Sequence, residues 1–233
     1  MQTDKLVELQ KQGGVELQKL GDTGMWYQEN FQMSAATAQV AERDWCGNNL
    51  KTVWYNCKNY RANLFLVDGR LLLRDLTKFD DRYQERYLEV PCENWLAIYD
   101  NLPVVDSRIW SRENAPCELS LQKEVVDIHS AEQTETTLCV SVIFADGTDG
   151  AILFYEEGIS FEGCGDIMYR MGTPDVETTQ TVADGKLCGM HNGFEYQVGI
   201  AAEIVSQTDG ILLRPENEKV YLQMNLRIEQ KNG

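Results

Sequence analysis

The second half of the chain consists of short segments of alternating apolar and polar residues, separated by two-residue turn signals. The alternation is clearest at Phe194, Tyr196, Val198 and Ile200 and again at Val220, Leu222, Met224 and Leu226. The turn signals are Asp146-Gly147, Asp149-Gly150, Asp184-Gly185, Asn192-Gly193 and Asp209-Gly210. Alternation indicates strands with one face on a core, and Asp-Gly or Asn-Gly favours tight hairpin turns. The pattern predicts a mainly β fold with an antiparallel β-sandwich over residues 116–233, and a barrel is the alternative.

The first 48 residues have a different pattern. Residues 4–12 predict a short helix that ends at Gly13-Gly14, and alternation over residues 15–20 predicts a short strand. Ser34 is placed to cap a second helix over residues 35–45. This order predicts a short N-terminal α/β segment, which has too few strands to build a parallel sheet of its own.

Residues 49–115 form a middle region between these two. Alternation over residues 51–76 predicts a β-hairpin with its turn at Asp68-Gly69. Residues 80–113, which contain Pro91 and Pro103, are predicted to be irregular, with one helical turn near residues 80–88. The predicted organisation therefore has three parts, residues 1–48, 49–115 and 116–233.

Charge and cysteine usage disfavour several classes of function. With 21 Lys+Arg against 37 Asp+Glu, the net charge of −16 disfavours binding to nucleic acid or to an anionic membrane surface. The seven cysteines are scattered and form no C-x-x-C pair, which is typical of free thiols in a reducing compartment. No run of about 18 apolar residues predicts a membrane span. We therefore expect a cytoplasmic protein.

Sequence motifs indicate no cofactor or metal site. The chain lacks the glycine-rich nucleotide-binding motifs and the serine-hydrolase and EF-hand motifs. Cys188 and His191 have the spacing of half a zinc site, but the only other histidine is His129. A cysteine–histidine nucleophile pair is another use of such residues. We expect no cofactor and no metal, and we expect His191 to begin a turn with Asn192-Gly193.

A charged block over residues 74–89 carries the carboxylates that glycoside hydrolysis would need. That reaction uses two carboxyl groups across the scissile bond, one of them kept protonated by its surroundings. The candidate catalytic residues are Asp75, Asp80, Asp81 and Glu85, and the block also holds Glu89. Neighbouring arginines, Arg82 and Arg86, are candidates to set the pKa values of these carboxyls or to hold hydroxyl groups. The alternative is a surface lattice of ion pairs.

Aromatic and amide side chains flank this block on both sides. Trp and Tyr rings stack on the apolar faces of sugars, and Asn amides pair with sugar hydroxyl groups. The candidate substrate-binding residues are Trp54, Asn56, Tyr60, Arg61, Arg74, Arg82 and Trp95. The alternative is that the aromatic side chains form the edge of a core, with their polar tips at the surface.

Residues 193–205, GFEYQVGIAAEIV, followed by DGILLRPENEKVYLQMNL, resemble the accessory β-sandwich that follows the catalytic barrel of many carbohydrate-active enzymes. The opening segment is similar to the closing units of such a barrel. The resemblance is one of pattern, covers about residues 117–229 in the sandwich, and supplies no catalytic residue by position. It implies a saccharide ligand and a place in a larger parent protein.

Two functions of different class are therefore predicted. The first is a carbohydrate-active protein, a glycoside hydrolase or a fragment of one, that combines an Asp/Glu pair with aromatic stacking. The second is a non-catalytic β-sandwich module for ligand binding or assembly. The expected partner is a saccharide or another small polar ligand, and a homo-oligomer or a larger parent protein is the further alternative. Neither nucleic acid nor a membrane is an expected partner.

Overall fold

The computed structural model describes residues 2–44, 46–48, 50–93, 100–105, 117–171 and 178–228. The chain divides into two compact units, Met1–Ala35 and Ala36–Gly233. The first unit is helical and the second contains two antiparallel β-sheets. This is the mainly β sandwich with a short N-terminal segment that the sequence predicts.

The first unit holds two helices, α1 (Gln2–Lys11) and α2 (Leu20–Asn30). Helix α1 ends as predicted, because Gly13 takes a left-handed φ of 74° and its amide donates to the Gln10 carbonyl. The predicted strand over residues 15–20 is wrong, since this stretch has no β pairing and leads directly into α2. Among the described residues, neither helix is both long and apolar enough to cross a membrane.

The first sheet, sheet A, has the order β1-β2-β3-β4-β6-β11-β16-β15, and β5 also pairs with β4. Every pairing within it is antiparallel. Its strands are β1 (Thr37–Ala41), β2 (Lys51–Asn56), β3 (Tyr60–Val67), β4 (Arg70–Lys78), β5 (Leu102–Val105), β6 (Cys117–Leu121), β11 (Ile167–Met171), β15 (Glu203–Gln207) and β16 (Gly210–Arg214).

The second sheet, sheet B, has the order β12-β13-β14-β17-β10-β9-β8-β7 and is also antiparallel. Among the described residues of the predicted irregular region, the 3-10 turn η1 (Arg86–Leu88) confirms the helical turn expected there. The strands of sheet B are β7 (Val125–Gln133), β8 (Leu138–Phe144), β9 (Asp149–Tyr155), β10 (Gly158–Glu162), β12 (Thr178–Ala183), β13 (Lys186–His191), β14 (Phe194–Ala201) and β17 (Lys219–Gln223).

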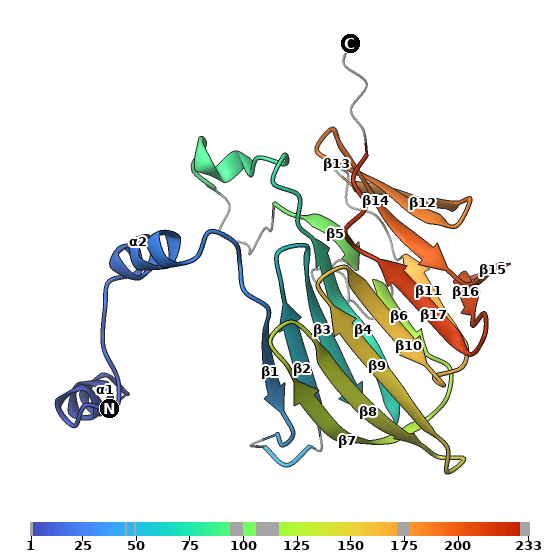
Figure 1. Cartoon of the computed structure of the whole chain (residues 1–233), viewed down its shortest axis with the longest axis horizontal. Coiled ribbons are helices and arrows are strands. Elements are labelled where there is room, and N and C mark those ends of the chain that lie inside the picture. The colour runs from blue at the N-terminus through green and yellow to red at the C-terminus, as the bar shows by residue number, and fades with distance from the viewer. Residues whose placement is uncertain are drawn as a thin grey trace. The chain divides into compact units, whose positions relative to one another are not determined.

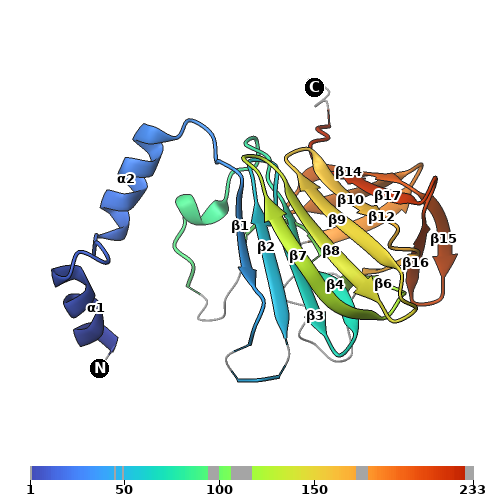
Figure 2. The same ribbon diagram turned by 60° about the horizontal axis from the view of Figure 1, so that its bottom comes forward.

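The two sheets pack face to face, with β7 to β10 over the strands of sheet A (Figures 1 and 2). The core between them is built largely from alternate residues of the central strands, as the period of two requires. On β8 the pattern is regular, because Leu138, Val140, Val142 and Phe144 are buried and the residues between them are half-buried. The outward side chains of sheet B therefore form a separate surface, on which polar residues such as Ser141 alternate with apolar ones such as Ile143.

The predicted Asp-Gly and Asn-Gly turns are mostly confirmed. Asp68-Gly69, Asp184-Gly185 and Asn192-Gly193 join paired strands, and both residues of each take positive φ. Asp149-Gly150 is not a turn, because both residues belong to β9. Gly150 lies on the core side there, where a Cβ atom would come within 2.8 Å of the Phe144 ring.

Other segments have a different secondary structure from the one that the sequence predicts. The predicted helix over residues 35–45 contains β1 instead, which pairs with β2 over five residues, Thr37 to Ala41. Trp45 lies outside the described residues. Besides β1, the strands β5, β11 and β12 were not predicted. β12 has a weak apolar pattern, because Thr178 and Gln180 occupy two of its inward positions and Val182 is its single inward apolar residue.

The turn between β16 and β17 places Glu218 in a strained, left-handed backbone conformation. Asn217 and Glu218 have φ values of 53° and 63°, and the flanking Glu216 and Lys219 exchange two backbone hydrogen bonds of 3.0 and 3.1 Å. Such a turn favours glycine at its second position, because a left-handed residue with a Cβ atom costs about 1–2 kcal/mol. Glu218→Gly is therefore expected to raise the free energy of unfolding by about 0.5–1 kcal/mol in urea titrations. Glu218→Ala keeps the Cβ atom, and an equal gain from it would contradict this explanation.

Candidate functional site

Four of the residues predicted from the first strands, Trp54, Asn56, Arg61 and Asp75, lie on the side of sheet A that faces away from the core. Arg61 on β3 places Nη2 3.0 Å from Oδ2 of Asp75 on β4, and its guanidinium lies 5.9 Å from the centre of the Trp54 ring. Asn56, on β2, is half-buried and pairs with Arg61 in the sheet register. The Asp75 side chain is only 6% exposed. Asp75 therefore has a cationic partner within its own sheet.

Arg74 lies beside a β-bulge, where the pairing of β3 with β4 shifts register between Asn63 and Leu64. Its Nε donates to Oδ1 of Asn63 at 2.6 Å, and its guanidinium lies 3.8 Å from the centre of the Phe65 ring. A guanidinium held by a hydrogen bond and a ring face has little freedom left for a ligand. The contacts of Arg74 with Asn63 and Phe65 therefore support a structural role on the surface of sheet A.

Tyr60 lies in the core between the two sheets and is fully buried. Its hydroxyl lies 2.7 Å from the carbonyl oxygen of Tyr155 and 3.0 Å from that of Gly158, both in sheet B. The ring has no exposed face on which a sugar can stack. Tyr60, a residue of sheet A, therefore links the two sheets through its hydroxyl group.

The charged block is held by ion pairs. Asp80 accepts hydrogen bonds from Nε and Nη2 of Arg82 at 2.8 and 2.6 Å, and these bonds lower the pKa of Asp80. Asp81 is exposed and lies 3.0 Å from Arg227, and Glu85 is exposed just before η1. These contacts match the ion-pair alternative. Trp95 lies outside the described residues, and the catalytic and substrate-binding roles of the set stay predictions.

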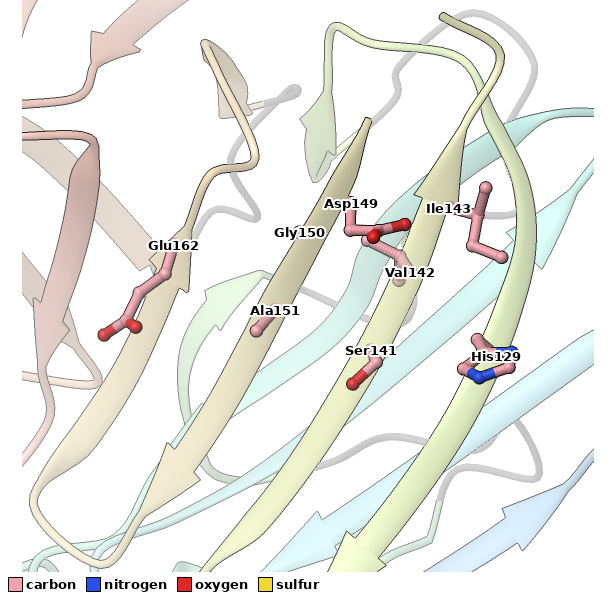
Figure 3. Close-up of a pocket in the computed structure, with 8 residues that line it drawn as sticks. All are labelled: His129, Ser141, Val142, Ile143, Asp149, Gly150, Ala151 and Glu162. Carbon is pink, nitrogen blue, oxygen red and sulfur yellow. The ribbon is translucent and has the colours of Figure 1, made fainter. Parts of the chain in front are cut away.

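An open groove of about 570 Å³ lies on the outer face of sheet B (Figure 3). Small-molecule sites usually have volumes of about 300–1,000 Å³. Four neighbouring strands, β7 to β10, supply its main lining side chains: His129, Ser141, Ile143, Asp149, Ala151 and Glu162. None of the predicted site residues is among its lining residues.

The groove exists because small side chains meet in one row of the sheet. Ser141 on β8 pairs with Ala151 on β9, which in turn pairs with Glu162 on β10. Paired residues lie side by side on one face, so the two small side chains leave a hollow beside their larger neighbours. His129 sits where the pairing of β7 with β8 shifts register, a bulge that directs its imidazole to the edge of the groove (Figure 3).

Only some of the polar side chains in the groove form hydrogen bonds or ion pairs with the rest of the protein. Oε1 of Glu162 accepts a hydrogen bond from Ser160 at 3.0 Å and lies 3.2 Å from Nζ of Lys219. Asp149 and His129 are exposed, and neither side chain has a hydrogen bond or ion pair within the described ranges. A ligand can bind such groups without first breaking a protein hydrogen bond. The groove therefore offers a carboxylate and an imidazole to a polar ligand.

A second polar cluster is buried in the sandwich. Nδ1 of His191 lies 2.8 Å from the Thr178 hydroxyl, and its Nε2 lies 3.1 Å from Oδ1 of Asp100. Asp100 also accepts hydrogen bonds from the Tyr83 hydroxyl at 2.6 Å and from the Arg86 amide at 2.7 Å. Hydroxyl, imidazole and carboxylate in this order form the catalytic triad of some enzymes. Here Thr178 and His191 are 5% and 1% exposed, so the cluster is a structural junction.

His191 begins the turn with Asn192-Gly193 as predicted. Cys188 is exposed on the same strand, β13, whereas His191 is buried. Residues three apart on a strand point to opposite faces, so the two do not form half of a zinc site. Within the described ranges, no group of three His, Cys, Asp or Glu side chains is arranged to hold a metal ion.

The sheet B groove differs from most of the predicted block in the partners of its side chains. Asp149 and His129 have no side-chain partner among the described residues, whereas Asp75, Asp80 and Asp81 each face an arginine and only Glu85 of the predicted catalytic set does not. Comparison with known proteins found no matching family model, no matching curated protein and no matching solved structure.

Proposed function

We propose that the chain is a ligand-binding β-sandwich module that takes a saccharide in the groove on sheet B. The observation that carries the proposal is the open hollow with an uncommitted carboxylate and imidazole, Asp149 and His129. Carboxylates accept hydrogen bonds from sugar hydroxyls, and an imidazole both donates and accepts. The net charge of −16 favours a neutral ligand over an anionic one.

Binding is better supported than hydrolysis. A glycosidase needs one carboxylic acid whose pKa is raised, so that it can donate a proton at neutral pH. The pKa of Asp80 is instead lowered by its hydrogen bonds to Arg82, and Asp75 is paired with Arg61. These carboxylates suit a structural role, and a binding module needs no proton donor.

The proposal is tested with Asp149→Asn, which keeps the size of the side chain and removes its charge. A hydrogen bond to a charged group contributes about 1.5–3 kcal/mol, so affinity for the bound sugar is expected to fall about tenfold or more. Ligands are found on an array of immobilised glycans, and affinities are then measured by calorimetry with the free sugar. The matched control is Asp81→Asn, since Asp81 is an exposed carboxylate outside the groove.

Two results would contradict the proposal. One is the absence of binding to every glycan on the array. The other is binding or glycoside turnover that survives Asp149→Asn and is abolished by Glu85→Gln, which would place the site in the charged block at residues 74–89.

A further inference from the structure

A second hollow of about 360 Å³ lies on the same face of sheet B as the groove. It is lined by Ala201, Glu216, Asn217, Lys219 and Tyr221, which come from β14, β17 and the turn before β17. Ala201 pairs with Tyr221 in the sheet, and Lys219 pairs with Glu162. The lining residues of this second hollow therefore continue the rows of outward side chains that form the groove.

The two hollows meet at one ion pair. Glu162 lines the groove, Lys219 lines the second hollow, and their charged atoms lie 3.2 Å apart. Together the hollows cross six adjacent strands in the order β7-β8-β9-β10-β17-β14. At roughly 4.8 Å between strands, five spacings amount to about 24 Å, which is much longer than a single sugar ring.

The second hollow also supplies an aromatic ring. Tyr221 is half-buried, and Nζ of Lys219 lies 5.6 Å from the centre of its ring. The turn that presents Asn217 is fixed, because the Glu218 carbonyl accepts a hydrogen bond from the Gly163 amide at 3.0 Å. A tyrosine ring beside an amide provides stacking and hydrogen bonding at the same position.

We propose that the second hollow is a further sugar subsite, and that one unbranched oligosaccharide occupies both hollows by crossing the Glu162–Lys219 pair. This inference rests on the proposed function. Asp149 and His129 bind one end of the chain, and Tyr221 stacks on a unit at the other end. An extended chain fits this surface better than a curved one, because the hollows follow one another across a sheet.

The inference predicts that affinity depends on chain length. We would titrate the full chain with glucose and with cello-oligosaccharides of two to six units, which are extended. Malto-oligosaccharides of the same lengths, which curve, are the comparison. Affinity for the cello series is expected to rise at least tenfold between one and about five units, because a second contact becomes intramolecular once both hollows are filled.

Three variants separate the two hollows. Tyr221→Ala is expected to remove most of the gain with length while leaving glucose binding unchanged, and Tyr221→Phe, which keeps the ring, is expected to retain it. Asp149→Asn is expected to weaken all lengths by a similar factor. Tyr155→Ala is the matched control, since Tyr155 lies on β9, which is separated from β17 by β10, and lines neither hollow. Unchanged thermal melting shows that each variant is folded.

The outcomes distinguish this inference from the function on which it rests. Glucose binding that is lost in Asp149→Asn but does not strengthen with chain length overturns the second subsite and leaves the proposed function intact. A gain with length that survives Tyr221→Ala also overturns it. Absence of binding to both series at every length overturns it as well, and absence of binding across the whole glycan array overturns the proposed function too.

Discussion

Replacing Gly158 with alanine is expected to lower the free energy of unfolding by about 3 kcal/mol or more. Gly158 is buried at the start of β10, where a Cβ atom would lie 2.1 Å from the carbonyl oxygen of Leu222 and 2.8 Å from the Tyr221 hydroxyl. The first of these is a backbone atom of the paired strand β17, so relief requires the two strands to separate. The Gly158 carbonyl also lies 3.0 Å from the Tyr60 hydroxyl that ties the sheets together.

The measurement is equilibrium unfolding in urea, with the midpoint and slope compared between variants. Gly24→Ala is the control, because nothing lies within 4 Å of a Cβ atom at Gly24. Alanine at this helical position is expected to leave the main transition unchanged, within about 0.5 kcal/mol. A loss below about 1 kcal/mol for Gly158→Ala would contradict the close approach of β10 and β17.

The β-sandwich was predictable because its signals are local. Asp68-Gly69 and Asn192-Gly193 specify turn geometry by themselves, and alternation on β14 and β17 reports a buried face directly. β1 was predicted as part of a helix because Ser34 is placed to cap one, whereas pairing with β2 determines its conformation. Residues 15–20 alternate as a strand would, but they have no partner strand. A single strand without one has no backbone hydrogen bonds between strands to stabilise it.

The candidate site was not predictable in the same way. The block at residues 74–89 is dense in charge along the chain, and this density reflects ion pairs such as Asp80 with Arg82. The groove instead takes His129, Asp149 and Glu162 from three different strands, and only the sheet register brings them together. The usable signal was the pair of small outward residues Ser141 and Ala151, but their alignment depends on the β8–β9 register.

Asp100→Ala is expected to lower the free energy of unfolding by about 3–5 kcal/mol at neutral pH. The Asp100 side chain is 0% exposed and accepts hydrogen bonds from Tyr83, Arg86 and His191. Its removal takes the acceptor away from the hydroxyl of the half-buried Tyr83 and from Nε2 of the buried His191. Asp81→Ala is the control, because the Asp81 side chain is 73% exposed, and it is expected to change stability by less than about 1 kcal/mol.

The contribution of Asp100 is also expected to depend on pH. Burial alone would raise the pKa of Asp100, but the hydrogen bonds from Tyr83 and the Arg86 amide, together with His191, lower it below its ordinary value. Because the folded pKa lies below the unfolded one, the stabilisation is fully present above about pH 4 to 5 and is lost as the pH falls through the folded pKa. The stability difference between the wild type and Asp100→Asn is therefore expected to be constant from about pH 7 to pH 5.

Below about pH 4 the stability difference between the wild type and Asp100→Asn should shrink. The wild-type carboxyl becomes protonated there and is then uncharged, like the amide of the variant. Urea unfolding of both proteins at several pH values between about 7 and 3 measures it. Asp80→Asn cannot serve as a pH-independent control in this experiment, because the hydrogen bonds from Arg82 lower the pKa of Asp80 as well. A difference that stayed constant down to about pH 3, or grew in acid, would contradict an ionised Asp100 at the junction with His191.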